Sequence, residues 1–169
     1  MTFKNILVAL ELSPRDEAVF SEAVSLAQSI GAQLTLIHCL SDFTEMAMMS
    51  QTGLGTGYGF PETSFTTTMS PAMANMELIE QANLTKHQQA EKHLAQYQQK
   101  AALGGVSVEY KCYESTTSIG SQICQIAEDL KADLIILGRK GHNGIAEALL
   151  GSVSNHVLHH APCAILVIQ

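Results

Sequence analysis

Short apolar runs and longer amphipathic stretches follow one another along the chain. Apolar runs with the length and β-branched content of buried strands occur at residues 5–10, 33–40, 133–137 and 164–168. Stretches whose apolar positions recur with helical spacing occur at residues 15–30, 76–103, 118–130 and 152–160. Residues 106–113 instead alternate apolar and polar side chains, which predicts a half-buried strand near an edge of the sheet.

The order of these elements predicts an α/β fold. Strands that alternate with helices favour an open, Rossmann-like parallel sheet of five strands with helices on both faces. We expect the strand order 3-2-1-4-5, in which the first and fourth strands flank the point where the order reverses. The whole chain, residues 1–169, is expected to form a single domain.

One stretch interrupts the pattern. Residues 51–70 are rich in Gly and Thr and carry a single charge, Glu62, so we predict a long inserted loop over about 41–75. The glycines in this stretch do not have the spacing of a dinucleotide fingerprint, and no helix follows them directly. The loop is interpreted either as an excursion without a role or as a lid or partner-binding segment.

Helix boundaries are also predicted by the sequence. Ser13 is expected to cap the first helix, with Pro14 in its first turn, and Gly31 is expected to end it. The pair Gly104-Gly105 is expected to end the long helix.

Composition narrows the class of protein. The chain has 169 residues, 46% of them hydrophobic and 15% charged, which argues against disorder and against a coiled coil. Its net charge of −7 and its lack of Trp argue against nucleic acids and anionic membrane surfaces as partners.

The cysteines and the N-terminal residues give no sign of export. Cys39, Cys112, Cys124 and Cys163 form no C-x-x-C pair, so we interpret them as free thiols that fill the core. No signal peptide is recognised, and no apolar run approaches the ~18 residues of a membrane span. We therefore expect a cytoplasmic protein.

Residues suited to binding a ligand are concentrated after the fourth predicted strand. A glycine-rich segment over residues 138–144 is followed by Gly151 to Asn155, which opens the last helix. Glycines let the main chain approach an anion closely, and a helix N-terminus offers unpaired N–H groups. Ser152 and Ser154 add hydroxyl donors, and Arg139 and Lys140 add positive charge. The pattern predicts binding of an anion or a nucleotide at the switch point of the sheet.

The spacing Gly138-x2-Gly141-x9-Gly151-Ser152 resembles the ATP-binding signature of the universal stress protein family. The resemblance extends to residues 6–13, 37–39, 132–138 and 161–167 and so covers nearly the whole chain outside the insertion. It implies the adenine nucleotide α-hydrolase-like version of the fold and binding of ATP, AMP or ADP, with Mg²⁺ as a companion of ATP.

The resemblance also implies roles for individual residues. Ribose and phosphates would be held by Gly138, Gly141, Gly151, Ser152 and Ser154, together with the backbone N–H of Val153. Lys140 would reach a phosphate, and Ala9, Cys39 and Leu137 would line the adenine slot. Glu11 stands where the family usually has Asp. Its carboxylate can still contact the nucleoside, although its side chain is one methylene longer.

No catalytic residue is predicted. The chain lacks the Gly-x4-Gly-Lys-Ser/Thr loop and shows no nucleophile–base pair. His142, His156, His159 and His160 are interpreted as surface or helix-end residues, and any metal ligand is left unassigned. We expect a nucleotide-responsive stress sensor or adaptor. The alternatives are a slow ATPase or nucleotide-processing enzyme, and a stress scaffold that does not use nucleotide.

The sequence also predicts that the chain associates with other protein chains. The last strand, residues 164–168, is apolar and uncharged, and an exposed edge of this kind invites pairing. The family commonly dimerises through this edge, so the resemblance implies a homodimer. A protein partner that reads the nucleotide state is expected, but its identity is not indicated.

Overall fold

The computed structural model describes residues 3–41, 71–115, 117–139 and 151–169. Its strands are β1 (Asn5–Ala9), β2 (Gln33–Ser41), β3 (Val108–Ser115), β4 (Leu134–Gly138) and β5 (Ala164–Ile168). Its helices are α1 (Asp16–Ile30), α3 (Pro71–Leu103), α4 (Ile119–Asp129) and α5 (Ser152–His160). None of the described helices is both long enough and apolar enough to cross a membrane.

The strands form one five-stranded sheet in the order β3-β2-β1-β4-β5, and all neighbours are parallel. The predicted fold class and strand order are confirmed. Ala9 at the end of β1 pairs with Ile37 of β2 and with Leu137 of β4. The carboxyl ends of the three central strands therefore meet at one edge of the sheet, where the strand order reverses.

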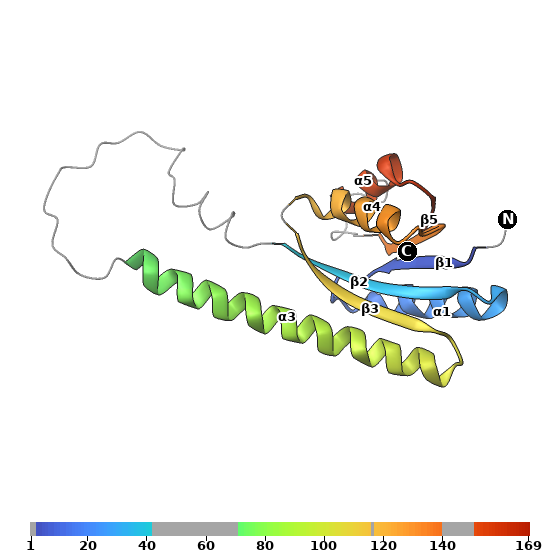
Figure 1. Ribbon diagram of the computed structural model, residues 1–169, viewed down its shortest axis with the longest axis horizontal. Coiled ribbons are helices and arrows are strands. Elements are labelled where there is room, and N and C mark those ends of the chain that lie inside the picture. Colours follow the sequence, from blue (N-terminus) through green and yellow to red (C-terminus); the bar gives the residue numbers. More distant parts are fainter. Residues whose placement is uncertain (1–2, 42–70, 116, 140–150) are drawn as a thin grey trace, which may run out of the picture.

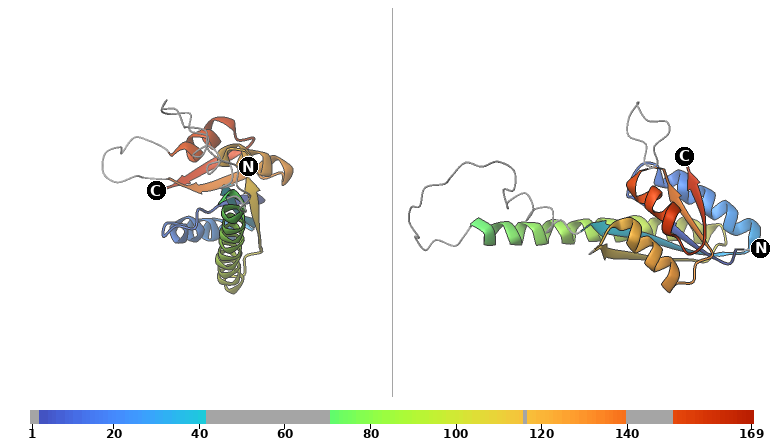
Figure 2. Two further views of the ribbon diagram at one scale, coloured as in Figure 1. Left: turned by 90° about the vertical axis from the view of Figure 1, so that its left-hand side faces the viewer. Right: turned by 90° about the horizontal axis from the view of Figure 1, so that it is seen from above.

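Helices cover both faces of the sheet, as predicted (Figure 1). Helices α1 and α3 lie on one face, and α4 and α5 lie on the other, an arrangement that is also visible from the side in Figure 2. Successive residues of β1 point to opposite faces: Val8 joins the core under α1 and α3, and Leu7 joins the core under α4 and α5. We call these two clusters the α1/α3 core and the α4/α5 core.

Large side chains and polar links hold α3 against the rest of the α1/α3 core. The rings of Phe20 on α1 and Tyr97 on α3 have centroids 4.4 Å apart. At the surface, the Lys100 ammonium lies 2.8 Å from the Glu17 carboxylate, and this hydrogen bond lowers the pKa of Glu17. The Gln98 side-chain amide donates to the Val108 carbonyl at 2.8 Å, which ties α3 to β3.

The α4/α5 core relies instead on close approach of two short helices. A Cβ built on Gly120 of α4 would lie 2.7 Å from the Cβ of His156 on α5. That distance is shorter than real Cβ contacts, so this crossing requires glycine.

The N-terminal part of α3 extends beyond the ends of the strands (Figure 1). Leu78 and Leu84 in this part are 64% and 59% exposed, whereas Ala90 and Leu94 further along are fully buried. The predicted insertion over 41–75 is thus too long at both ends, because Ser41 belongs to β2 and residues 71–75 belong to α3. Its remaining part, residues 42–70, lies outside the described residues.

Two boundaries of α1 differ in how well the sequence predicts them. Gly31 ends the helix with a φ of +72°, and its N–H donates to Ala27, as expected. The prediction of Ser13 as the cap is wrong, because the helix begins at Asp16 and Pro14 precedes it. The Ser13 hydroxyl oxygen accepts from the Arg15 N–H at 3.3 Å within the preceding turn.

The two edge strands differ from the central strands in burial. β3 occupies one edge and exposes Glu109, Lys111 and Glu114, in line with its predicted half-buried character. β5 occupies the other edge and is only partly buried, so the prediction of a buried strand at residues 164–168 is wrong. Its Leu166 is 37% exposed.

Candidate functional site

A cavity of about 330 Å³ opens at the carboxyl ends of the central strands. It lies where β1 and β4 are neighbours, which is the switch point of the sheet. Its walls come from the ends of β1, β2 and β4, from the N-terminal parts of α4 and α5, and from α3.

All predicted site residues that the structure describes line this cavity. They are Ala9, Glu11, Cys39, Leu137, Gly138, Gly151, Ser152, Val153 and Ser154. Lys140 and Gly141 lie outside the described residues, so the structure gives no position for either. The fold therefore brings together segments that are more than a hundred residues apart in the sequence.

The N-terminus of α5 forms one wall of the cavity. Gly151 precedes the helix with a φ of −59° and a ψ of 160°, and no side chain caps the first turn. The first N–H groups of an α-helix have no partners within the helix, and the helix dipole adds positive potential there. The buried Ser154 hydroxyl donates to the Gly151 carbonyl at 3.3 Å and fixes this turn. The wall is suited to an anionic group.

The turn between β1 and α1 forms a second wall. Its Leu10, Glu11 and Leu12 all line the cavity. The carboxylate of Asp16, the first residue of α1, accepts hydrogen bonds from the N–H groups of Glu11 at 3.1 Å and Leu12 at 2.9 Å. Leu12 has a φ of +59°, in the left-handed region that non-glycine residues rarely adopt.

Sequence reasoning missed the contribution of α3. Lys86 and Gln89 of this helix line the cavity, although they lie more than forty residues after the end of β2 in the sequence. His38 was missed as well: it lines the cavity beside Cys39, and its Nδ1 lies 2.7 Å from the Leu10 carbonyl oxygen. Ile119 and Ile123 of α4 add an apolar patch.

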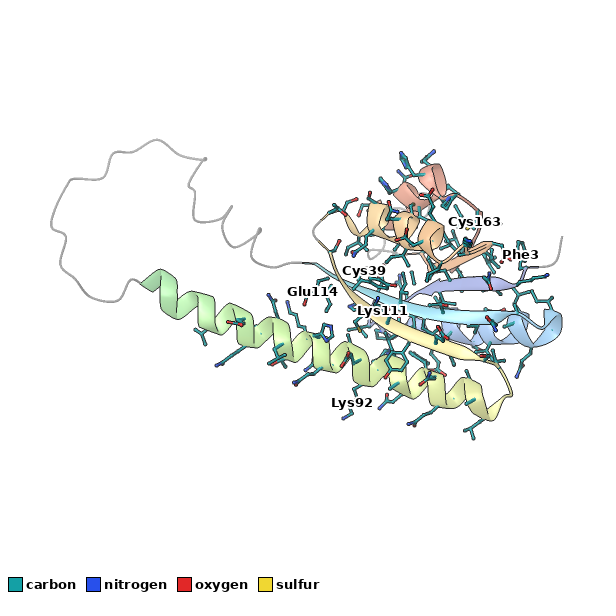
Figure 3. The ribbon with its side chains drawn as sticks, in the orientation of Figure 1. Phe3, Cys39, Lys92, Lys111, Glu114 and Cys163 are labelled. Atoms are coloured by element: carbon teal, nitrogen blue, oxygen red, sulfur yellow. The ribbon has the colours of Figure 1, made fainter. Side chains whose placement is uncertain are left out.

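The thiols are unsuited to nucleophilic chemistry. Burial, with a smaller contribution from Cys112, raises the pKa of Cys39 to about 12. Burial is also the main reason that the pKa of Cys112 is raised to about 11, and it raises the pKa of Cys124 and Cys163. Because the thiolate is the nucleophilic form, protonated thiols serve here as small apolar side chains. Figure 3 shows Cys39 near the carboxyl end of β2.

No metal-binding cluster stands out in the ranges that the structure describes, where no three His, Cys, Asp or Glu side chains are grouped to hold an ion. His156 and His160 stack with ring centroids 4.2 Å apart, and His160 Nδ1 lies 2.8 Å from the His156 carbonyl oxygen. His159 and His160 lie in the last turn of α5, where the sequence placed them. His142 is outside the described residues.

The model of the universal stress protein family matches residues 64–169. Universal stress protein Sll1388 of Synechocystis is 29% identical over 170 residues, covering 100% of this chain and 99% of that protein. The chain belongs to the universal stress protein family.

Solved structures show the same fold. UspA from Lactobacillus plantarum matches with a TM-score of 0.73 and 24% identity, covering 100% of this chain and 99% of that one. A universal stress protein from Archaeoglobus fulgidus in complex with dAMP matches with a TM-score of 0.60 and 18% identity over 100% of both chains. An Arabidopsis thaliana family member with AMP bound matches with a TM-score of 0.57 and 15% identity, covering 98% of this chain and 90% of that one.

Proposed function

We propose that this protein binds an adenine nucleotide, ATP or its products ADP and AMP, in the cavity at the switch point of the sheet. We further propose that it acts as a nucleotide-responsive stress sensor or adaptor in the cytoplasm. The observation that carries the proposal is the convergence of the α5 N-terminus and the β1, β2 and β4 ends on one cavity. Bound dAMP in the Archaeoglobus relative and AMP in the Arabidopsis relative support the ligand class.

The shape and the chemistry of the cavity suit such a ligand. A volume of about 330 Å³ lies at the lower end of the range for small-molecule sites, roughly 300–1,000 Å³. Ala9, Cys39 and Leu137 offer an apolar slot for the base, and Glu11 offers a carboxylate to the ribose hydroxyls. The α5 N-terminus faces the place proposed for the phosphates, and the family resemblance implies that Gly141 and Lys140 contact them. We assign no protein ligand to Mg²⁺.

The test starts from the purified protein. Denaturation and mass spectrometry identify any nucleotide that it carries, and calorimetry measures the affinity for ATP, ADP, AMP and, as a control, GTP. Gly141→Val fills the space expected for the phosphates and abolishes binding. Glu11→Ala weakens binding, whereas Glu22→Ala, an exposed carboxylate of α1, leaves it unchanged. Absence of any adenine nucleotide binding in the wild type contradicts the proposal and favours a scaffold role.

Hydrolysis is tested in the same preparation. Phosphate release from ATP by the wild type at the same rate as by Gly141→Val fits a binding protein. Steady release above that of the variant would favour the slow ATPase instead.

We also propose a homodimer through β5. This strand has one edge paired with β4, carries no charge and exposes Leu166. An unpaired apolar edge favours pairing with a second copy. Leu166→Lys should yield a monomer in light scattering at micromolar concentration, and Leu84→Lys, the same change at an exposed leucine of α3, should leave the dimer intact. A wild-type monomer overturns the proposal.

A further inference from the structure

A buried carboxylate lies directly behind the proposed nucleotide site. Asp16 is 2% exposed, and its two oxygens are shared among three donors of the β1–α1 turn. Oδ1 accepts from the Glu11 N–H at 3.1 Å and faces the Ser13 hydroxyl at 3.4 Å, and Oδ2 accepts from the Leu12 N–H at 2.9 Å. A carboxylate can accept from two neighbouring N–H groups at once because both of its oxygens are acceptors.

The turn needs this support because the sheet ends just before it. The Leu10 N–H still donates to the Ile37 carbonyl of β2 at 2.9 Å. The next two N–H groups, of Glu11 and Leu12, donate to Asp16 instead. The positive φ of Leu12 is strained for a leucine and persists where surrounding contacts impose it. Asp16 therefore sets the main-chain position from which Glu11 enters the cavity.

A second helix reaches the same carboxylate. His93 of α3 places Nε2 3.4 Å from Asp16 Oδ2, and this nitrogen is buried without a hydrogen bond to any described residue. The His93 ring packs edge-on against Tyr97, with centroids 4.8 Å apart. Gln89, which lines the cavity, lies one helical turn before His93 on the same side of α3. The α3 wall and the β1 wall of the cavity thus meet at Asp16.

We propose that Asp16 is a positioning residue of the nucleotide site, and that His93 joins α3 to it. Asp16 holds Glu11 and Leu12 in the conformation that binds the nucleoside, and the polar edge of His93 fixes α3 relative to that carboxylate. The proposal rests on the proposed function, since it assigns Asp16 a role in the same site. Neither residue contacts the ligand; both act through the residues that do.

Asp16→Asn tests the positioning role. Asparagine keeps the shape of the side chain, but its NH₂ group would face a backbone N–H, so one of the two hydrogen bonds is lost. We expect the affinity for ATP to fall about tenfold, as for loss of a charge-assisted hydrogen bond. The amide proton resonance of Glu11 or Leu12, whichever faces the new NH₂ group, should shift upfield in the NMR spectrum.

Glu17→Gln is the matched control. It removes the same charge from the next residue of α1 and with it the ion pair to Lys100 of α3, yet it touches neither N–H group. We expect unchanged affinity and unchanged Glu11 and Leu12 resonances. Equal affinities of Asp16→Asn and wild type, or equal losses in both variants, overturn the proposal.

Substitutions of His93 provide a second test, which does not depend on whether Asp16→Asn folds. His93→Phe keeps the aromatic packing on Tyr97 and removes the polar edge, so the affinity should fall severalfold. His93→Gln returns a polar group to the position beside the Asp16 carboxylate and should recover the affinity. Equal affinities of the two variants contradict the role of His93. If the wild type binds no nucleotide, the proposed function fails, whereas the amide shifts of Glu11 and Leu12 still test whether Asp16 holds the turn.

Discussion

The two faces of the sheet are built by different means. The α1/α3 core uses a long helix, paired aromatic rings and polar links such as Lys100–Glu17. The α4/α5 core uses two short helices that approach closely at Gly120 and pack with several small or sulfur-containing side chains. Both contribute walls to the cavity.

The difference indicates how each wall is fixed. A long helix anchored at several points keeps its position when one contact is lost, even where the loss lowers stability. The position of a crossing that depends on one glycine changes with a single added methyl group. The α5 N-terminus, which we propose receives the phosphates, therefore depends on the tight crossing.

Leu94→Ala should have the largest effect on stability. The side chain is fully buried between α3 and the sheet, and truncation of a buried leucine costs about 2–5 kcal/mol. Chemical denaturation measures the change in the free energy of unfolding. Leu84→Ala is the matched control, because it makes the same change at a residue that is 59% exposed on the same helix, and it should change stability by less than about 0.5 kcal/mol. Equal losses would show that the projecting part of α3 is packed in solution.

Gly120→Ala tests the crossing of α4 and α5. The added methyl group would overlap the Cβ of His156, and overpacking of this kind costs about 1–3 kcal/mol. Because α5 must move to make room, nucleotide affinity should fall as well. Ser121→Ala, an exposed change at the next residue, should alter neither quantity. Loss of stability without loss of affinity would show that the α5 wall moves independently of the crossing.

Substitutions at the C-terminal ends of α1 and α4, which lie on opposite faces of the sheet, should change stability in opposite directions. Gly31, directly after the end of α1, has a φ of +72°, and Lys131, two residues after the end of α4, has a φ of +51°. Gly31→Ala should destabilise by about 1 kcal/mol, and Lys131→Gly should stabilise by somewhat less, because only glycine adopts this region without strain. Thermal unfolding of both variants checks the two signs. Destabilisation by Lys131→Gly would contradict the argument.

Alkaline pH should lower the stability of the folded protein through one buried acid in each core, the Cys39 thiol in the α4/α5 core and the Tyr97 hydroxyl in the α1/α3 core. The Cys39 thiol has its pKa raised from 9.0 to about 12, and the Tyr97 hydroxyl has its pKa raised from 10.0 to about 12 by burial and then by Glu17. Above pH 9 the unfolded chain releases the thiol proton while the folded chain keeps it, so stability falls as pH rises. Cys39→Ala should make this fall shallower from pH 9 upward, and Tyr97→Phe should do so only above pH 10. Identical slopes for wild type and both variants would exclude these groups as the cause.

The sequence was sufficient for the fold because strands and helices alternate with clear periodicities. It also placed Glu11, Gly138 and Ser152 near one another, since parallel strands bring their carboxyl ends to the same edge. It was insufficient for α3. Residues 71–75 carry no charge and follow a Gly- and Thr-rich stretch, so the sequence pattern did not reveal that the helix begins at residue 71. Nothing in the sequence assigned Lys86 and Gln89 to the cavity. The spacing Ser13-x-x-Asp16 resembles a capping box and was the available signal for Asp16.

The length of α3 has a mechanical consequence. A helix of 33 residues is about 50 Å long, whereas β2, the longest of the described strands with 9 residues, spans about 30 Å. The part of α3 that packs against the sheet begins at Ala90. Lys86 and Gln89, which line the cavity, lie just before it, where the helix leaves the sheet. A tilt of about 5° there displaces the far end by roughly 2–3 Å over the ~30 Å arm. A small rotation of α3 at the cavity wall would therefore move the N-terminal end of the helix, away from the sheet, by a larger distance.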